Sequence, residues 1–157
     1  MKKNNMKTIS LGTDHAGYQL KELVKSHLEK KGYQIIDFGT SSEEAVDYAD
    51  FVIPAAEAVA HGEADLGLVF GGSGNGEAIA ANKVRGVRCA LCWNVQSALL
   101  AKEHNNANVI ALGGRMVSDA EALAIVDQWL EASFEGGRHL RRIQKVGDYE
   151  TGRASRR

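Results

Sequence analysis

Short apolar runs alternate with amphipathic segments along most of the chain. Residues 7–13 alternate apolar and small polar side chains, which is typical of a strand that enters a core. The apolar positions that follow have the spacing of one helix face and are Leu20, Leu23, Val24 and Leu28. The same patterns predict strands at 33–38, 65–70, 87–92 and 108–112, and helices at 50–61, 77–83, 95–104 and 119–130.

Glycine and proline mark the ends of the predicted helices. Gly32 and Gly62 follow the first and second helices, at the position where a left-handed glycine often ends a helix. Pro54, the only proline, is predicted in the first turn of the second helix, where a missing N–H does little harm. A terminal helix is predicted from residue 138 to about 149, and residues 150–157 form a polar tail that we expect to fray.

This order of elements predicts an α/β fold. Because each strand is followed by a helix, the simplest arrangement is a Rossmann-like, doubly wound, five-stranded parallel sheet with helices on both faces, plus a C-terminal helix. A closed eight-stranded barrel would need about 250 residues, whereas the chain has 157. We expect residues 1–157 to form a single domain, with its core and terminal helix at about 7–149.

Composition and charge argue against several classes of partner. The apolar fraction is 44%, the charged fraction is 25% and the formal net charge is −1, so the chain as a whole favours neither nucleic acid nor a membrane surface. No stretch approaches the roughly 20 apolar residues of a membrane span, and the apolar run after the basic start is too short for a secretion signal. Together with only two cysteines, these features predict a cytoplasmic protein.

Cys89 and Cys92 have the C-x-x-C spacing of redox and metal sites. They fall in a predicted strand, where residues three apart face opposite sides, and the chain has no further cysteine to complete a zinc site. Both are therefore predicted to pack in the core, and we predict no metal site. His27 and His61 lie on predicted helices and are expected to face solvent.

Polar side chains gather in the loops that follow the strands. In a doubly wound sheet these loops converge beyond the carboxyl ends of the strands, where ligands bind. The side chains expected in this crevice are Asp14, His15, Ser73, Asn75, Glu77 and Arg115. His104 and the two residues after it, in contrast, end a helix at the opposite edge of the sheet. If they are functional, we expect them to serve the site of a second copy of the chain.

The loop after the third strand carries the strongest signal. Gly71, Gly72, Gly74 and Gly76 occupy four of six positions, directly before Glu77. Their spacing does not match the dinucleotide motif, and Glu77 stands where a nucleotide-binding P-loop has lysine. A flexible turn is the simpler alternative, but it would not need four glycines together with a carboxylate. The loop is better interpreted as backbone N–H groups that hold ligand oxygens, with Glu77 as a general base.

The end of the chain is basic. From Arg138 onward there are seven Lys and Arg residues against Asp148 and Glu150, a balance of +5. Arg138 and Arg142 share one face of the predicted helix, and two guanidinium groups on one face suit a phosphate. A solvated charge run is the alternative. Together with the glycine loop and the base, the arginines favour a phosphorylated substrate that undergoes proton transfer.

At these residues the chain resembles the ribose-5-phosphate isomerase type B family, which also includes galactose-6-phosphate isomerase. The resemblance covers residues 7 to about 149. The motifs that carry it are Gly12-Thr-Asp-His-Ala-Gly17, Gly71-Gly-Ser-Gly-Asn-Gly-Glu77 with the helix to Lys83, His104-Asn105, Asn108-Val109, Gly113-Gly-Arg115, and Glu135-Gly-Gly-Arg-His139 with Arg142. One branch of the family has a catalytic cysteine directly after the third strand. This chain has glycine there and resembles the other branch, whose base is a glutamate that matches Glu77.

The resemblance implies an aldose–ketose isomerase of the pentose phosphate pathway, which interconverts ribose 5-phosphate and ribulose 5-phosphate through an enediolate without metal or cofactor. The catalytic residues it implies are Glu77 as the base, His104 as the acid–base group that opens the sugar ring, and Ser73 as a helper of proton exchange between oxygens. The substrate-binding residues it implies are Asp14, His15, Tyr48, Gly72, Gly74, Asn75, Gly76, Asn105, Arg115, Arg138, His139 and Arg142. Among these, the three arginines would bind the phosphate. Because the family is built on dimers, the resemblance also implies a homodimer, or a tetramer, whose site is shared between subunits.

One departure from the family pattern bears on the substrate. The family usually has Asp-Tyr-Pro after the loop of the second strand, and this chain has Asp47-Tyr48-Ala49. The local turn, and with it the accepted sugar length, can therefore differ. Isomerases of four-carbon erythrose or six-carbon allose and galactose phosphates stay open as alternatives. An alternative of another class is a non-catalytic sugar-phosphate sensor, which would need the loop and the arginines but no base.

Overall fold

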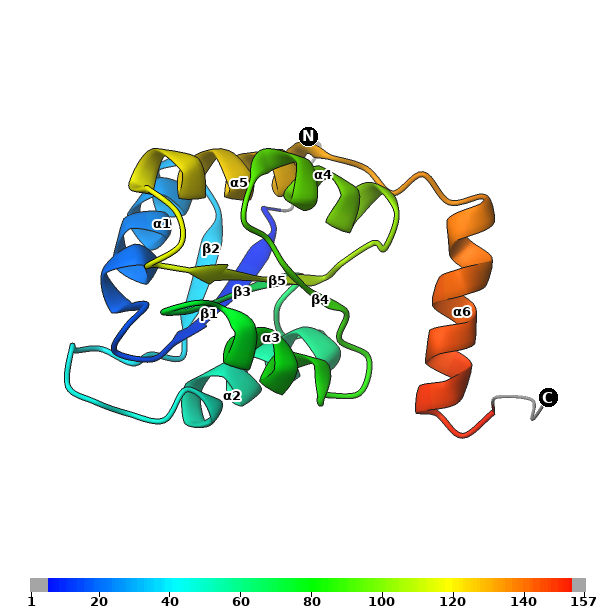
Figure 1. Ribbon diagram of the computed structural model, residues 1–157, viewed down its shortest axis with the longest axis horizontal. Helices are drawn as coiled ribbons and strands as arrows, with labels where there is room; N and C mark the ends of the chain where they lie inside the picture. The colour runs from blue at the N-terminus through cyan, green and yellow to red at the C-terminus, as the bar shows by residue number, and fades with distance from the viewer. Residues whose placement is uncertain (1–5, 154–157) are drawn as a thin grey trace.

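The computed structural model describes residues 6–153 as a parallel sheet between two layers of helices, with one helix set apart (Figure 1). The strands are β1 (Thr8–Thr13), β2 (Gln34–Asp37), β3 (Leu66–Gly71), β4 (Cys89–Leu91) and β5 (Val109–Gly113), in the order β2-β1-β3-β5-β4. The helices are α1 (Tyr18–Lys30), α2 (Ala49–Ala60), α3 (Asn75–Asn82), α4 (Val95–Glu103), α5 (Asp119–Glu131) and α6 (Arg138–Glu150). The predicted doubly wound α/β fold is confirmed.

The structure describes the two ends of the chain only in part. The predicted terminal helix is α6, which extends to Glu150. The last part of the predicted polar tail, residues 154–157, and the basic start, residues 1–5, lie outside the residues that the structure describes. Within residues 6–153, no helix has both the length and the apolar character that a membrane crossing requires.

The two central strands carry the core. Every residue of β3 and β5 is buried, and alternate side chains face opposite layers. Leu68 and Leu112 pack with α1, α4 and α5, whereas Val69 and Ala111 pack with α2 and α3. Strands that are buried on both faces have continuous runs of apolar residues. The sequence pattern therefore predicts these two strands clearly.

β1 and β3 are neighbours at the place where the strand order reverses. The chain runs from β1 outward to β2 and then returns to β3 on the other side of β1. The register pairs Thr13 with Phe70, so the two strands end at almost the same level. The loops that follow them therefore meet at the carboxyl edge of the sheet, which is where doubly wound folds bind ligands.

Pro54 does not lie in the first turn of its helix, so that prediction is wrong. α2 begins at Ala49, because the Tyr48 carbonyl already accepts the N–H of Val52 at 2.9 Å. Pro54 is therefore in the second turn, where its missing N–H leaves the Asp50 carbonyl without a helical donor. Asp50 is exposed, so water can take the place of that donor.

The two cysteines face opposite layers, as predicted. Cys89 packs against the layer of α2 and α3, whereas Cys92 is buried in the layer of α1, α4 and α5. Burial raises the pKa of both thiols, that of Cys92 to about 12. Neither side chain forms a thiolate readily, so the pair is structural.

His27 does not face solvent, so the prediction for that residue is wrong, whereas His61 is exposed as predicted. The His27 side chain is only 23% exposed, and its Nε2 lies 2.8 Å from Asp127 Oδ1. The reason is the packing of α1 against α5, which places His27 on the shared side of the two helices.

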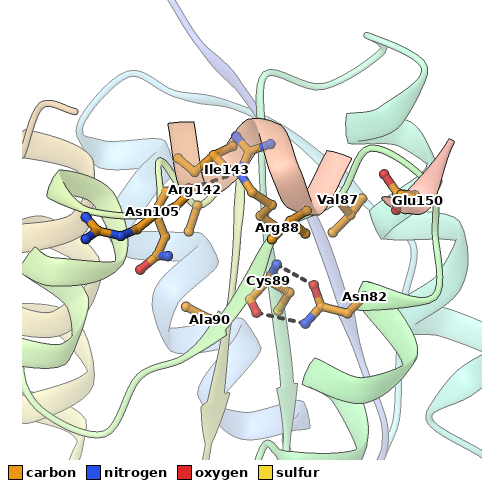
Figure 2. Close-up of a pocket in the computed structure, with 11 residues that line it drawn as sticks. Asn82, Val87, Arg88, Cys89, Ala90, Asn105, Arg142, Ile143 and Glu150 are labelled. Atoms are coloured by element: carbon orange, nitrogen blue, oxygen red, sulfur yellow. Dashed lines mark hydrogen bonds between the residues drawn. The ribbon is translucent and has the colours of Figure 1, made fainter. Parts of the chain in front are cut away.

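α6 stands apart from the layers, beside the edge strand β4 (Figure 1). Its exposed apolar side chains are Leu140 (45% exposed), Val146 (62%) and Tyr149 (80%). A cavity of about 570 Å³ lies between α6 and the body, and Figure 2 shows Arg142, Ile143 and Glu150 on the α6 side of it. The carboxylate of Glu150 accepts a hydrogen bond from the Gly86 N–H at 3.0 Å, which anchors the last turn of α6 to the body. A single chain thus leaves much of the apolar surface of α6 uncovered.

Candidate active site

A crevice of about 360 Å³ opens at the carboxyl edge of the sheet, between the loops that follow β1, β3 and β5. The residues that line it are Asp14, His15, Ala16, Tyr48, Gly72, Ser73, Gly76, Glu77, Arg115 and Met116. Eight of these ten are site residues predicted from the sequence. Ala16 and Met116 are additional, because an alanine or a methionine carries no chemical signal that would single it out.

Glu77 is the buried carboxylate of this crevice. It lies in the first turn of α3 and is only 4% exposed. Burial raises its pKa, and the charge of Asp14 raises it further, while hydrogen bonds from the N–H groups of Glu77 and Gly74 act in the opposite direction. The net effect is a raised pKa. A carboxylate whose pKa moves toward neutrality is suited to take up and return a proton.

Gly71 makes room for that carboxylate. A Cβ atom on Gly71 would lie 2.0 Å from Glu77 Oε1, so the carboxyl group occupies the space that a side chain at position 71 would fill. A side chain at position 71 would therefore displace the Glu77 carboxyl group from this place.

Tyr48 reaches the crevice although Ala49 stands where the family pattern has proline. Its ring lies against Gly76, where an added Cβ would be 2.7 Å from Tyr48 Cζ. α2 begins directly after Tyr48, so the start of the helix sets the position of this side chain. Tyr48 is 39% exposed and faces the open crevice.

Asp14 and His15 follow β1 and are held by the backbone of two loops. Asp14 Oδ1 accepts the N–H groups of Ala16 and Gly17 at 2.9 and 3.1 Å, which turns the chain into α1 and leaves Oδ2 free. His15 Nδ1 accepts the Val46 N–H at 3.2 Å. In the neutral ring the proton therefore belongs on Nε2, which makes that atom a donor toward a ligand.

Arg115 places a positive charge at the mouth of the crevice. Its N–H donates to the Gly72 carbonyl at 3.0 Å, which ties the loop after β5 to the loop after β3. Its guanidinium lies over Gly72, where an added Cβ would be 3.0 Å from Nη1. The exposed guanidinium remains available to an anion.

Gly74 and Asn75 do not line the crevice of the single chain, and their predicted part in substrate binding stays a prediction. Gly74 is buried with a φ of 85°, the left-handed conformation that lets the chain turn from the loop into α3, and it packs against Leu91. Asn75 is exposed, and its N–H donates to Ser73 Oγ at 3.2 Å. Both residues therefore shape the loop.

The other predicted site residues lie away from this crevice. None of His104, Asn105, Arg138, His139 and Arg142 lines it. Asn105 and Arg142 instead line the 570 Å³ cavity beside α6 (Figure 2). Arg142 Nη1 donates to the Arg138 carbonyl at 3.4 Å, in keeping with their position on one helix face. Within one chain, the predicted site residues therefore form two separate groups, as the topology leads us to expect.

His104, Glu135 and His139 form a group in which a metal ion can be considered, because their ligand atoms lie within 4.8 Å of one another. The two imidazole rings are stacked, however, with centroids 4.2 Å apart and planes inclined by 13°. Nitrogen lone pairs lie in the ring planes, so here they run side by side instead of converging on one ion at about 2.0–2.1 Å. The group fits a zinc ion poorly.

Lys21 is a structural residue near the site that sequence reasoning missed. It is only 1% exposed, and its Nζ lies 2.9 Å from Asp37 Oδ2 and donates to the Thr40 carbonyl at 2.8 Å. These contacts fix the start of the segment that leads from β2 to Tyr48. The position of Lys21 between Leu20 and other buried positions of α1 is the signal that could have identified it.

Replacing Glu77 by Gln is expected to stabilise the fold at neutral pH. Because the pKa of Glu77 is raised, its ionisation is less favourable in the folded than in the unfolded chain. Wild-type stability therefore falls as pH rises from the unfolded pKa of about 4.3 through the raised folded pKa. Urea unfolding of both proteins should show an advantage of Glu77→Gln that grows over this window and is absent below it. An advantage that is the same at every pH would contradict this origin.

Comparison with known proteins identifies one family. The family model that matches the chain is described as Ribose/Galactose Isomerase and spans residues 9–146. Ribose-5-phosphate isomerase B of Mycolicibacterium paratuberculosis is 52% identical over 144 residues, which cover 90% of this chain and 91% of that protein.

Two solved structures resemble this one closely. Ribose-5-phosphate isomerase B of Clostridium thermocellum has a TM-score of 0.91 at 51% identity, covering 92% of this chain and 98% of that one. Ribose-5-phosphate isomerase B of Mycoplasma genitalium with bound ribulose-5-phosphate has a TM-score of 0.88 at 42% identity, covering 92% of this chain and 96% of that one. The similarity therefore extends over nearly the whole length of each chain.

Proposed function

The chain belongs to the ribose/galactose isomerase family, and we propose on that premise that it interconverts ribose 5-phosphate and ribulose 5-phosphate through an enediolate. The observation that carries the proposal is the buried Glu77 carboxylate, seated against Gly71 in a crevice that also holds His15 and Arg115. A relative of 52% identity bears the name ribose-5-phosphate isomerase B, and a solved structure of 42% identity holds ribulose-5-phosphate.

In the proposed reaction, Glu77 moves one proton between two carbons. It removes the proton from C2 of the open-chain aldose, the electron pair forms the C1=C2 bond, and the negative charge collects on O1. A proton then passes from O2 to O1, C2–O2 becomes the carbonyl, and C1 takes a proton back from Glu77. The backbone N–H groups of Ser73 and Gly76, which line the crevice, would stabilise the enediolate oxygen, by about 3 kcal/mol per donor.

Ser73 is proposed to carry the proton between the two oxygens. It lines the crevice beside Glu77, and its Oγ accepts the Asn75 N–H at 3.2 Å. That contact uses an acceptor site of the hydroxyl and leaves its proton free to donate. The proton can therefore be given to O1 as the one from O2 is taken up.

The remaining crevice residues are proposed to hold the sugar and its phosphate. The Nε2–H of His15 and the free Oδ2 of Asp14 offer a donor and an acceptor to sugar oxygens. Arg115 supplies one guanidinium for the phosphate. Proton transfer and phosphate binding are thereby assigned to different parts of the crevice.

We propose that the active unit is a homodimer whose site is shared between subunits. The exposed apolar side chains of α6 and the cavity beside it support a second copy packing against that region. The partner's His104, the partner's Arg138 and the partner's Arg142 would then complete the crevice of the first chain. We place this enzyme in the cytoplasm and its reaction, without metal or cofactor, in the pentose phosphate pathway.

Mixing two inactive variants is expected to restore activity if the site is shared. Glu77→Gln removes the base and His104→Asn removes the ring-opening group, so a mixed dimer has one site with both defects and one site with neither. Random association of equal amounts should give about a quarter of the wild-type rate on ribose 5-phosphate. Co-expression of differently tagged chains supplies the mixed dimer. A rate no higher than that of the separate variants would contradict a shared site.

The proposed function is tested by a product assay. The protein incubated with ribose 5-phosphate should form ribulose 5-phosphate, which is resolved from the aldose by NMR. Erythrose 4-phosphate, allose 6-phosphate and galactose 6-phosphate, tested in parallel, show whether the Tyr48-Ala49 turn has changed the accepted sugar length. Binding without product from any of these aldose phosphates would identify a sugar-phosphate sensor instead of an isomerase.

A further inference from the structure

Three side chains from separate segments meet beyond the end of α4. His104 caps α4, Glu135 lies in the connection between α5 and α6, and His139 is in the first turn of α6. Glu135 Oε2 lies 3.3 Å from His139 Nε2 and 4.0 Å from His104 Nε2. The two imidazole rings are stacked, with centroids 4.2 Å apart. The carboxylate therefore faces the same edge of both rings.

The backbone fixes this arrangement. The Glu135 N–H donates to the carbonyl of Glu103, the residue before His104, at 3.0 Å. Gly136 and Gly137 then turn the chain with φ values of 68° and 56°, and this brings His139 back over His104. The backbone of Glu135 is thus held beside His104, and the side chain, which is 46% exposed, reaches the edge of both rings.

His139 is the most buried residue of the three. It is only 8% exposed, and its Nε2 is buried without a hydrogen bond of good geometry. A buried ring nitrogen needs a partner, and Glu135 Oε2 at 3.3 Å is the group in position to supply one. The charged groups that face His139 are His104, Arg138 and Glu135, and only the last is an anion.

His104 depends on its neighbours for its orientation. Its side chain is 34% exposed, and its ring contacts the flat face of His139 and the edge near Glu135. Because the two rings are in contact face to face, a rotation of the His139 ring would also change the plane of the His104 ring.

We infer that Glu135 is a positioning residue for the ring-opening step: it orients His139, whose ring in turn fixes the plane of the His104 imidazole. This inference rests on the proposed function, in which His104 opens the furanose. In that step O1–H loses its proton, the C1–O4 bond breaks, C1=O1 forms and O4 takes a proton. The protons balance, and a correctly oriented acid–base group is needed to move them. Glu135 does not touch the sugar in this account.

The chemistry of the two sugars makes the inference testable. Ribose 5-phosphate closes a five-membered ring through O4 and must be opened before C2 can be deprotonated. Ribulose 5-phosphate has its carbonyl at C2, so a five-membered ring would need O5, which carries the phosphate. The ketose is therefore an open chain. A defect confined to ring opening slows the aldose reaction and leaves proton exchange on the ketose intact.

Glu135→Gln is the decisive variant, and Glu131→Gln at the exposed end of α5 is its matched control. General acid–base catalysis typically raises a rate by about 10²–10⁴-fold. A misoriented His104 would lose part of that rate enhancement, so kcat for ribose 5-phosphate should fall about tenfold. Exchange of the C1 protons of ribulose 5-phosphate with D₂O should stay within about twofold of wild type, because Glu77 catalyses it without ring opening. Glu131→Gln should match wild type in both measurements.

Two results would overturn the inference. One is an unchanged aldose rate in Glu135→Gln, and the other is an equal loss in both assays, which would indicate general damage to the site. Failure of the proposed function looks different, since wild-type protein would then neither convert the aldose nor exchange the ketose protons.

Discussion

Glu77→Gln is expected to lower kcat for ribose 5-phosphate by about 10³-fold or more while the substrate still binds. The amide has nearly the shape of the carboxylate but no basic lone pair, so it can fill the space against Gly71 without accepting the C2 proton. Its loss removes the only base in the crevice whose pKa burial raises. The effect should therefore appear in kcat and leave the affinity for the sugar phosphate nearly unchanged.

Two measurements check this expectation together. Solvent exchange of the substrate proton at C2, followed by NMR in D₂O, should be abolished in Glu77→Gln, and calorimetry should show that ribose 5-phosphate still binds. Glu63→Gln, at an exposed position after α2, is the matched control and should behave as wild type. Normal turnover by Glu77→Gln would show that another residue is the base.

Gly71→Ala is expected to lower kcat by about 100-fold, because a shift of about 1 Å in a reacting group can have an effect of that size. The added methyl would collide with Glu77 Oε1 at 2.0 Å, so the carboxylate must move away from the end of β3. The backbone at Gly71 is not in the left-handed region, so alanine fits the strand itself. The damage should thus be confined to the position of Glu77.

Steady-state kinetics and thermal unfolding separate this effect from misfolding. Gly71→Ala should retain cooperative unfolding, with a KM close to that of wild type and a reduced kcat. Ser26→Ala, at an exposed position of α1 outside the crevice, is the matched control. If Gly71→Ala kept full kcat, the position of the carboxylate would not matter as we describe.

Much of the fold follows from local patterns in the sequence. β3 and β5 are apolar on both faces and each ends in a glycine, and helices such as α1 show a regular apolar face. The two exceptions have different causes, one local and one distant in the chain. Pro54 lies deeper in α2 than predicted because a backbone carbonyl before the helix starts it early, and His27 is held by Asp127, one hundred residues away.

The candidate site was predictable in its chemistry and less so in its geometry. Glu77, His15 and Arg115 stand in strand-end loops, and parallel strands bring such loops together. The Glu77 carboxyl group fills the space that a side chain at Gly71 would take, six residues earlier in the chain. This contact depends on the direction in which α3 leaves the loop, and the spacing of residues in the sequence does not reveal that direction. The same holds for Gly74, which shapes the turn and does not line the crevice.

The most direct test of the account is wild-type conversion of ribose 5-phosphate in D₂O, with the product examined by NMR. Proton transfer through an enediolate and Glu77 predicts that deuterium accumulates at C1 of ribulose 5-phosphate during prolonged incubation at equilibrium, because the carboxyl proton exchanges with solvent in a fraction of the turnovers. Ribulose 5-phosphate that still carries no deuterium at C1 after many turnovers would indicate direct hydrogen transfer from C2 to C1, and it would contradict the role of Glu77 as the base.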